Sequence, residues 1–284
     1  MQTVTANGLQ FRFLSAGASD GPLALCLHGF PDSAHTWRHL LPELARAGFR
    51  AVAPFMRGYA PTQVPGDGAY QTGALAADAN ALHEALDGGP DAVLIGHDWG
   101  AATAYGASAL APGRWRRVVA LAVPPVNSMA AAFFDYEQLK RSFYIFLFQT
   151  PLAEMALNRS FVEGLWRDWS PGYEAAEDVA HAMDCLRSPE HATAAIGYYR
   201  AMLDGSRHVE AYATEQAAMT RVGERPVLYL HGADDGCLGA AAVQDAERYL
   251  PAGSRVEVVP GAGHFLQLER PVEVNSRILG WVTG

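Results

Sequence analysis

The stretch Val93-Leu94-Ile95-Gly96-His97-Asp98-Trp99-Gly100 determines how this chain is expected to fold. A short apolar run ends in the pattern Gly-x-Asp-x-Gly, and an alanine-rich segment over residues 101–110 follows directly. This order of strand, sharp turn and helix is that of a nucleophile elbow, which exposes its central residue at the carboxyl end of the strand. The flanking glycines give the crowded turn the room that it needs. Because the central residue is Asp98, the sequence predicts a carboxylate nucleophile.

The composition indicates a globular protein without a nucleic-acid or membrane surface. Half of the 284 residues are hydrophobic, and 30 acidic against 21 basic residues give a net charge of −9. No run of Lys and Arg occurs, so we expect neither a nucleic-acid partner nor attraction to anionic lipid. No apolar run reaches the roughly 20 residues that cross a bilayer, and no secretory signal is visible. The three cysteines lack C-x-x-C spacing, which is typical of free thiols, so we expect a cytoplasmic protein.

Strand and helix patterns alternate on both sides of the elbow, which predicts a mostly parallel α/β sheet. The first 16 residues are expected to form a hairpin around Asn7-Gly8, a dipeptide that favours tight turns. The other expected strands and helices follow in the order 23–27, helix 37–46, 50–55, helix 71–86, the elbow, 117–123, 226–230, helix 239–250, 255–259 and a last helix from residue 271.

The alternation stops in the segment between residues 126 and 220. Helical patterns replace it, at residues 136–148, 153–166, 175–186 and 193–203. A helical insert in an α/β sheet usually covers the carboxyl edge of the strands, where ligands bind. We therefore expect a core domain of residues 1–125 and 221–284, with residues 126–220 forming a helical cap, or lid, domain.

A carboxylate nucleophile suits attack on a saturated carbon that carries a leaving group, and the product is an alkyl ester of the enzyme. Hydrolysis of that ester requires a general base, an acid that orients the base, and donors for the oxyanion. The candidate base is His264, in a glycine-rich loop after the last expected strand. The candidate acid is Asp235, in the loop after the preceding strand, and Asp234 is the alternative.

The expected oxyanion donors are two backbone N–H groups. One belongs to Trp99, directly after the nucleophile, and the other to Phe30, in a loop that follows the strand 23–27. Three histidines beside glycines at strand ends are interpreted as structural side chains, namely His28, His97 and His231.

The chain resembles the α/β-hydrolase-fold epoxide hydrolases over nearly its whole length. The motifs that carry the resemblance occur in the family's order: His28-Gly29-Phe30-Pro31, Arg57-Gly58-Tyr59, Gly96-His97-Asp98-Trp99-Gly100 and Gly263-His264-Phe265. The resemblance implies an α/β-hydrolase fold with an eight-stranded, mostly parallel sheet, flanking helices and an inserted cap. It also matches the order nucleophile, acid and histidine along the chain.

The resemblance further implies two cap tyrosines that hold the epoxide oxygen. A phenol, with a pKa near 10, can bind this oxygen and donate a proton as the C–O bond breaks. Tyr144, with its downstream Phe-Gln-x-Pro, is similar to the first of these tyrosines, and Tyr199 is similar to the second. The adjacent Tyr198 is expected to point away, because neighbours on a helix diverge by about 100°. The alternative interpretation is that these tyrosines only pack the cap.

The function that the resemblance implies is epoxide hydrolysis to a vicinal diol. The expected partners are a small apolar epoxide and water, with no metal and no organic cofactor, and the oligomeric state is left open, a homodimer included. Haloalkane dehalogenases share the aspartate elbow, but Phe30 lacks the side-chain donor that they place in the first loop. Haloacid dehalogenases of the fluoroacetate type expect Arg at the position of Trp99. A non-enzymatic receptor on this fold would not require the complete catalytic set.

Overall fold

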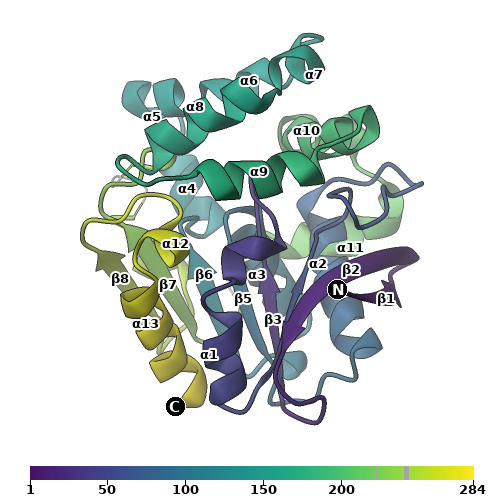
Figure 1. Ribbon diagram of the computed structural model, residues 1–284, viewed down its shortest axis with the longest axis vertical. Coiled ribbons are helices and arrows are strands. Elements are labelled where there is room, and N and C mark those ends of the chain that lie inside the picture. The colour runs from purple at the N-terminus through teal and green to yellow at the C-terminus, as the bar shows by residue number, and fades with distance from the viewer. Residues whose placement is uncertain (222, 240–242) are drawn as a thin grey trace.

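The computed structural model describes residues 1–221, 223–239 and 243–284. Its centre is an eight-stranded sheet in the order β1-β2-β4-β3-β5-β6-β7-β8 (Figure 1). Only β1 with β2 and β2 with β4 pair antiparallel, and all other neighbours are parallel. The strands are β1 (Gln2–Ala6), β2 (Leu9–Ala16), β3 (Leu23–Leu27), β4 (Arg50–Pro54), β5 (Val93–His97), β6 (Arg117–Leu121), β7 (Val227–Gly232) and β8 (Arg255–Val259). The predicted fold class is confirmed.

The hydrophobic pattern of each strand explains its place in the sheet. Every residue of β3, β5 and β7 is buried, as expected for parallel strands that are covered on both faces. The predicted hairpin joins β1 to β2 through Asn7 and Gly8, which both have positive φ (45° and 73°). Such a pair matches the twist of the two strands, which is why Asn-Gly favours this turn.

Helices cover both faces of the sheet. Figure 1 shows α1 (Leu41–Arg46) and α13 (Pro271–Thr283) in front of it, and α2 (Thr72–Ala85) and α3 (Trp99–Leu110) behind. The short helix α12 (Leu266–Glu269) directly precedes α13. No helix in the described part of the chain is long and apolar enough to span a membrane.

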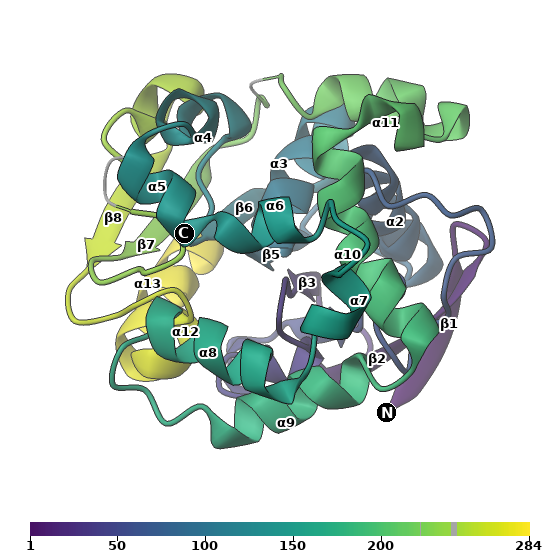
Figure 2. The same ribbon diagram turned by 90° about the horizontal axis from the view of Figure 1, so that it is seen from above.

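The segment between β6 and β7 is helical and lies mainly over one end of the sheet (Figures 1 and 2). Most of its helices form a layer at the carboxyl ends of the parallel strands, whereas α11 packs beside α2 and α3. The helices are α4 (Val126–Ala132), α5 (Tyr136–Arg141), α6 (Phe143–Leu147), α7 (Ala153–Ala156), α8 (Arg159–Trp169), α9 (Ala176–Cys185), α10 (Pro189–Leu203) and α11 (Ala213–Ala218).

Several expected helices are divided in the structure. The patterns at 136–148 and 153–166 each form two helices, and α8 begins anew because Asn158 accepts a hydrogen bond from the Phe161 N–H (3.1 Å). The expected helix at 37–46 is a 3₁₀ turn followed by α1, and α4 and α11 were not predicted. The helix expected at 239–250 lies in part outside the described residues, and its described part holds a 3₁₀ turn, Ala246–Tyr249.

Candidate active site

The candidate site lies where four parallel strands end. Phe30 follows β3, Asp98 follows β5, Asp235 follows β7 and His264 follows β8. Because these strands are parallel neighbours or nearly so, their carboxyl ends bring the loops to one edge of the sheet. Residues that are up to 234 positions apart in the chain therefore share one site.

The elbow holds Asp98 in a strained conformation, with φ 53° and ψ −117°. A Cβ atom on Gly96 would lie 2.0 Å from the carbonyl oxygen of Gly100, and one on Gly100 would lie 2.2 Å from the carbonyl oxygen of Leu27. Only glycine fits at both positions, so the turn can be this tight and Asp98 can project from it.

The Asp98 carboxylate is bound on one oxygen and faces a histidine with the other. Its Oδ1 accepts a hydrogen bond from the backbone N–H of Phe30 (2.8 Å). Its Oδ2 lies 3.7 Å from Nε2 of His264. Trp99 is the first residue of α3, where backbone N–H groups have no partner within the helix. The N–H groups of Phe30 and Trp99 are thus both available close to this carboxylate.

Asp235 holds His264 from the opposite side. Its Oδ2 lies 3.0 Å from Nδ1 of His264, and its Oδ1 accepts the backbone N–H groups of Cys237 (2.7 Å) and Leu238 (2.9 Å). Asp235 is buried, whereas the side chain of Asp234 is exposed. Asp235 therefore keeps a proton on Nδ1 and leaves Nε2 directed at Asp98.

The electrostatics of the site favour a charged imidazole. Burial acts to lower the pKa of His264, but Asp235 and then Asp98 outweigh it and raise this pKa to about 10. Burial likewise opposes charge on Asp235, but His264 holds the pKa of this carboxyl below its ordinary value. At neutral pH His264 is consequently a cation between two carboxylates.

The two predicted tyrosines, Tyr144 and Tyr199, pack edge to face near the catalytic carboxylates and His264. The ring centroids of Tyr144 and Tyr199 are 5.4 Å apart, and both side chains are buried. Burial raises the pKa of both phenols well above 10, so they keep their protons. Tyr144 Oη lies 3.7 Å from the sulfur of Cys237, and the Tyr199 hydroxyl has no hydrogen-bond partner among the described residues. The Tyr198 hydroxyl instead donates to the carbonyl oxygen of Arg57 (2.8 Å).

The three strand-end histidines make structural contacts, as interpreted. His28 Nε2 accepts the backbone N–H of Met56 (3.0 Å). The ring of His97 contacts the carbonyl oxygen of His264 (2.9 Å), and that of His231 contacts the carbonyl oxygen of Leu238 (3.1 Å). All three rings are buried and stiffen the loops around the site.

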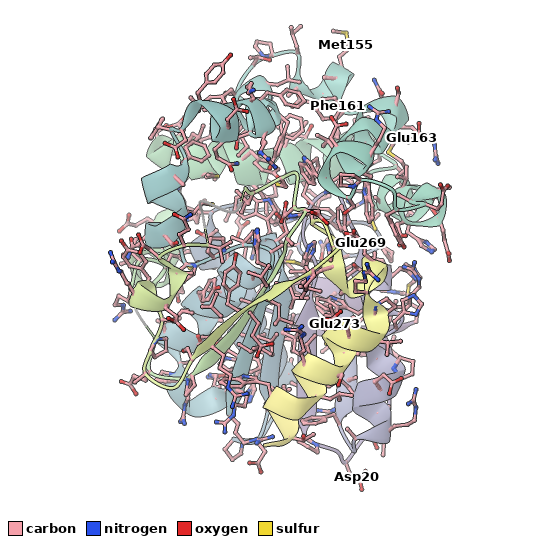
Figure 3. All side chains as sticks on the ribbon, turned by 90° about the vertical axis from the view of Figure 1, so that its left-hand side faces the viewer. Asp20, Met155, Phe161, Glu163, Glu269 and Glu273 are labelled. Carbon is pink, nitrogen blue, oxygen red and sulfur yellow. The ribbon has the colours of Figure 1, made fainter. Side chains whose placement is uncertain are left out.

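Hydrogen bonds join the end of α8 to the His264 loop, and the sequence did not predict them. The carbonyl oxygen of Trp169 accepts the backbone N–H groups of Gly236 (3.1 Å) and His264 (3.0 Å). The hydroxyl of Ser170 donates to Glu269 (2.6 Å), which also accepts the N–H of Gly263 (2.7 Å). Figure 3 places Glu269 between Glu163 of the upper helices and Glu273 of α13. Nothing in the sequence signals this contact, because it joins segments about 100 residues apart.

Arg57, in the motif Arg57-Gly58-Tyr59, has a structural role. Its guanidinium is buried and binds both oxygens of Asp78, through Nε (2.5 Å) and Nη2 (2.7 Å). Since its carbonyl oxygen also accepts the Tyr198 hydroxyl, Arg57 joins α2 to α10. The motif thus anchors the helix that carries Tyr199.

One group of possible metal ligands occurs among the described residues. Asp235, Cys237 and His264 each offer one ligand atom, all within 4.8 Å of one another. Asp235 and His264 already bind each other, and burial raises the pKa of the Cys237 thiol well above its ordinary value, which keeps it protonated. The group fits a hydrogen-bonded array better than a metal centre.

A cavity of about 220 Å³ opens on Asp98. Tyr144, Tyr199 and Trp99 line it near the carboxylate, and the rest of its wall is mostly apolar. A reactive carboxylate, two phenols and a small apolar chamber together suit an uncharged substrate that needs both a nucleophile and a proton donor.

Comparisons with known proteins agree with this geometry. Residues 22–271 match the model of the alpha/beta hydrolase fold family. The chain is 31% identical to epoxide hydrolase A of Mycobacterium tuberculosis (99% of this chain, 96% of the relative) and 30% identical to the AB hydrolase superfamily protein YfhM of Bacillus subtilis (99% and 97%). The structure of the Bacillus megaterium epoxide hydrolase superposes with a TM-score of 0.81 at 26% identity and full coverage of both chains.

Proposed function

The chain belongs to the α/β-hydrolase-fold family, and on this premise we propose that it acts as an epoxide hydrolase in which Asp98 forms a covalent ester. One observation carries the proposal. Two buried, protonated tyrosine hydroxyls line the same small cavity as the carboxylate, and that of Tyr199 has no partner among the described residues. A substrate oxygen that becomes negative as a C–O bond breaks would supply the partner.

In the first step Tyr144 and Tyr199 hold the epoxide oxygen and Asp98 attacks a ring carbon. A bond forms between a carboxylate oxygen and this carbon, and the C–O bond of the ring breaks. The new alkoxide takes a proton from one phenol, and the proton of His264 is then available to restore that phenol. The product of the step is a hydroxyalkyl ester with a neutral imidazole beside it.

Formation of the ester switches His264 from acid to base. The raised pKa of His264 depends in part on the charge of Asp98, which the ester no longer has. His264, oriented by Asp235, then removes a proton from water, and the hydroxide attacks the carbonyl carbon of Asp98. The N–H groups of Phe30 and Trp99 stabilise the oxyanion. The tetrahedral intermediate expels the diol alkoxide, which takes the carboxyl proton, so the free enzyme returns with His264 charged.

We assign this chemistry to two parts of the chain. Residues 1–125 and 221–284 form the catalytic core, and residues 126–220 form the cap that supplies Tyr144 and Tyr199. A small apolar epoxide and water are the substrates, and the cycle above uses no metal or organic cofactor. The three buried cysteines are all free, which supports the cytoplasmic location expected from the sequence.

A haloalkane dehalogenase is the second candidate, because the indole N–H of Trp99 is buried without a partner among the described residues and could hold a halide. The test is turnover of a small terminal epoxide beside the matched terminal bromoalkane, with Asp98→Ala as the blank. Diol from the epoxide alone supports the proposal. Halide release without diol would assign Trp99 to the leaving group and would overturn the proposal.

A further inference from the structure

The cavity approaches Asp98 from one side only. Its lining residues belong to α2, α3, α4, α6, α10, α11, the segments next to these helices and, through Cys237 and Leu238, the loop after β7. Among the described residues none belongs to α8, α9 or α12. Figure 2 shows the difference from above, with α3, α4, α6 and α11 around one half of the view and α8, α9 and α12 in the other.

On its open side the cavity follows α3. Trp99, Ala102 and Tyr105 line it at intervals of three residues, which is one face of the helix. From Asp98 to Tyr105 this face extends over about 10 Å, at the helical rise of about 1.5 Å per residue. The whole cavity, including the part beside Asp98, measures about 220 Å³. The open side thus accommodates one substituent of modest size.

The part of the cavity that follows α3, which we call the arm, is mostly apolar. Methionine side chains of α4, α10 and the segment after α11 line it, and such flexible thioethers fit varied apolar shapes. Among its polar residues, Thr72 and Gln216 bind each other (3.3 Å), and Gln216 also accepts the N–H of Gly73 (2.8 Å). A ring nitrogen of His208 contacts the carbonyl oxygen of Ala201 (2.9 Å). These polar atoms are already in use, so the arm selects for hydrocarbon surface.

The other side of the tyrosine pair is filled by aromatic rings. Phe30 and Phe148 have no exposed surface, and their centroids are 5.6 Å apart. Tyr199 lies 5.2 Å from Phe30 and 5.3 Å from Phe148, and Tyr144 lies 5.1 Å from the buried ring of Trp169. Phe30, Phe148 and Trp169 do not line the cavity. Among the described residues, close packing of this kind leaves no second arm beside the tyrosine pair.

Asp98 must attack a ring carbon from the side opposite to the C–O bond that breaks, and this requirement fixes the orientation of the epoxide in the site. Its oxygen points to Tyr144 and Tyr199, the attacked carbon faces Asp98, and the C–C bond of the ring lies across this direction. Substituents on the two carbons therefore project to opposite sides. We propose that the substrates are terminal epoxides with one apolar substituent, which lies along α3, and that Phe148 excludes epoxides substituted on both carbons. This inference rests on the proposed function.

The test compares two isomers of equal composition, 1,2-epoxyhexane and trans-2,3-epoxyhexane. We expect kcat/KM to be about 10- to 200-fold higher for the terminal isomer, the range by which a pocket rejects one misplaced methylene. The variant Phe148→Ala should raise the relative kcat/KM of the trans isomer. Phe146→Ala is the matched control, since Phe146 lies on the helix that ends at Phe148, is exposed and does not line the cavity, and it should leave the ratio between the isomers unchanged. Phe148→Leu serves the same purpose if the alanine variant does not fold.

The outcomes separate the two proposals. Equal kcat/KM for both isomers in the unaltered enzyme would overturn the single-arm inference while epoxide hydrolysis stands. A terminal preference that neither Phe148 variant reduces would overturn the role of Phe148. Absence of diol from both isomers, and of an ester on the His264→Gln variant in intact mass, would mean that the proposed function fails and the inference with it.

Discussion

Nε2 of His264 lies 3.7 Å from Oδ2 of Asp98, which is too far for a hydrogen bond and close enough for strong attraction between opposite charges. The lone pairs of Oδ2 are therefore not taken up by a donor from His264. Oδ1, in contrast, is held by the Phe30 N–H. We infer that Oδ2 is the atom that attacks the substrate.

Removing the base should separate the two halves of the reaction. In His264→Gln the ester should form and persist, because no group remains that can deprotonate water. Intact-protein mass spectrometry after incubation with epoxide should show an increase equal to the substrate mass, and turnover should fall by about 10³-fold or more. Asp98→Ala should show neither adduct nor diol. An adduct on Asp98→Ala would place the nucleophile elsewhere.

Two adjacent carboxylates provide a matched pair for the orienting acid. Asp235→Asn should lower kcat by about 10³- to 10⁴-fold, because the amide no longer selects the required tautomer of His264. Asp234→Asn should keep its activity, since Asp234 is exposed and the contact to His264 comes from Asp235. Steady-state kinetics with one terminal epoxide distinguishes them. Equal losses in both variants would contradict the assignment.

The tyrosines can be tested with their own neighbour as the control. The double change of Tyr144 and Tyr199 to Phe should remove epoxide opening while the protein stays folded, because only two hydroxyls are lost. Tyr198→Phe should keep the chemistry and lower the free energy of unfolding by about 1 kcal/mol, the value of one hydrogen bond. Diol assays and urea unfolding measure the two effects. Epoxide opening that survives the double change would show that the tyrosines only pack.

The pH dependence of ester hydrolysis should differ from the titration of the free enzyme. In the free enzyme Asp235 and Asp98 raise the pKa of His264 to about 10, so the imidazole loses its proton only as the pH rises through that value. In the ester Asp98 is neutral and this pKa falls, so the base is active at lower pH. Single-turnover decay of the ester should therefore reach half its maximal rate below pH 10. A midpoint equal to that of the free enzyme would refute the switch.

The buried ion pair of Arg57 and Asp78 should dominate local stability. Arg57→Met leaves the carboxylate of Asp78 buried and unpaired, which should lower the free energy of unfolding by about 3–5 kcal/mol. The exposed pair of Arg46 and Glu43 is the control, and Arg46→Met should cost less than about 1 kcal/mol. Urea denaturation of both variants checks the difference. Similar losses would mean that Arg57 contributes only through its backbone.

Local patterns explain what could be predicted from the sequence. The Gly-x-Asp-x-Gly turn is a steric requirement of a few consecutive residues, so the elbow and its strand could be placed without the structure. Buried parallel strands are also recognisable in the sequence as apolar runs, and the dipeptide Asn7-Gly8 predicted the hairpin. The chain order of Asp98, Asp235 and His264 placed all three at the ends of strands.

What could not be predicted depends on contacts between distant residues. The closed side of the cavity follows from rings of Phe30, Phe148 and Trp169 that meet only in the folded chain. The helix α11 is short and polar in part, and its place is determined by packing on α2 and α3. Periodicity carries no information about such contacts.

The carbonyl oxygen of Trp169 has a consequence for how substrate enters. Because it anchors the backbone of both Gly236 and His264, an outward displacement of α8 would release the acid loop and the base together. Substrate therefore cannot enter by displacement of α8 while the loops of Asp235 and His264 keep their catalytic arrangement. The cavity lies toward the opposite rim, where residues of α4, α6 and α11 line it. The edge of the helical layer at α8 thus supports the catalytic loops, whereas the edge at α4, α6 and α11 borders the cavity.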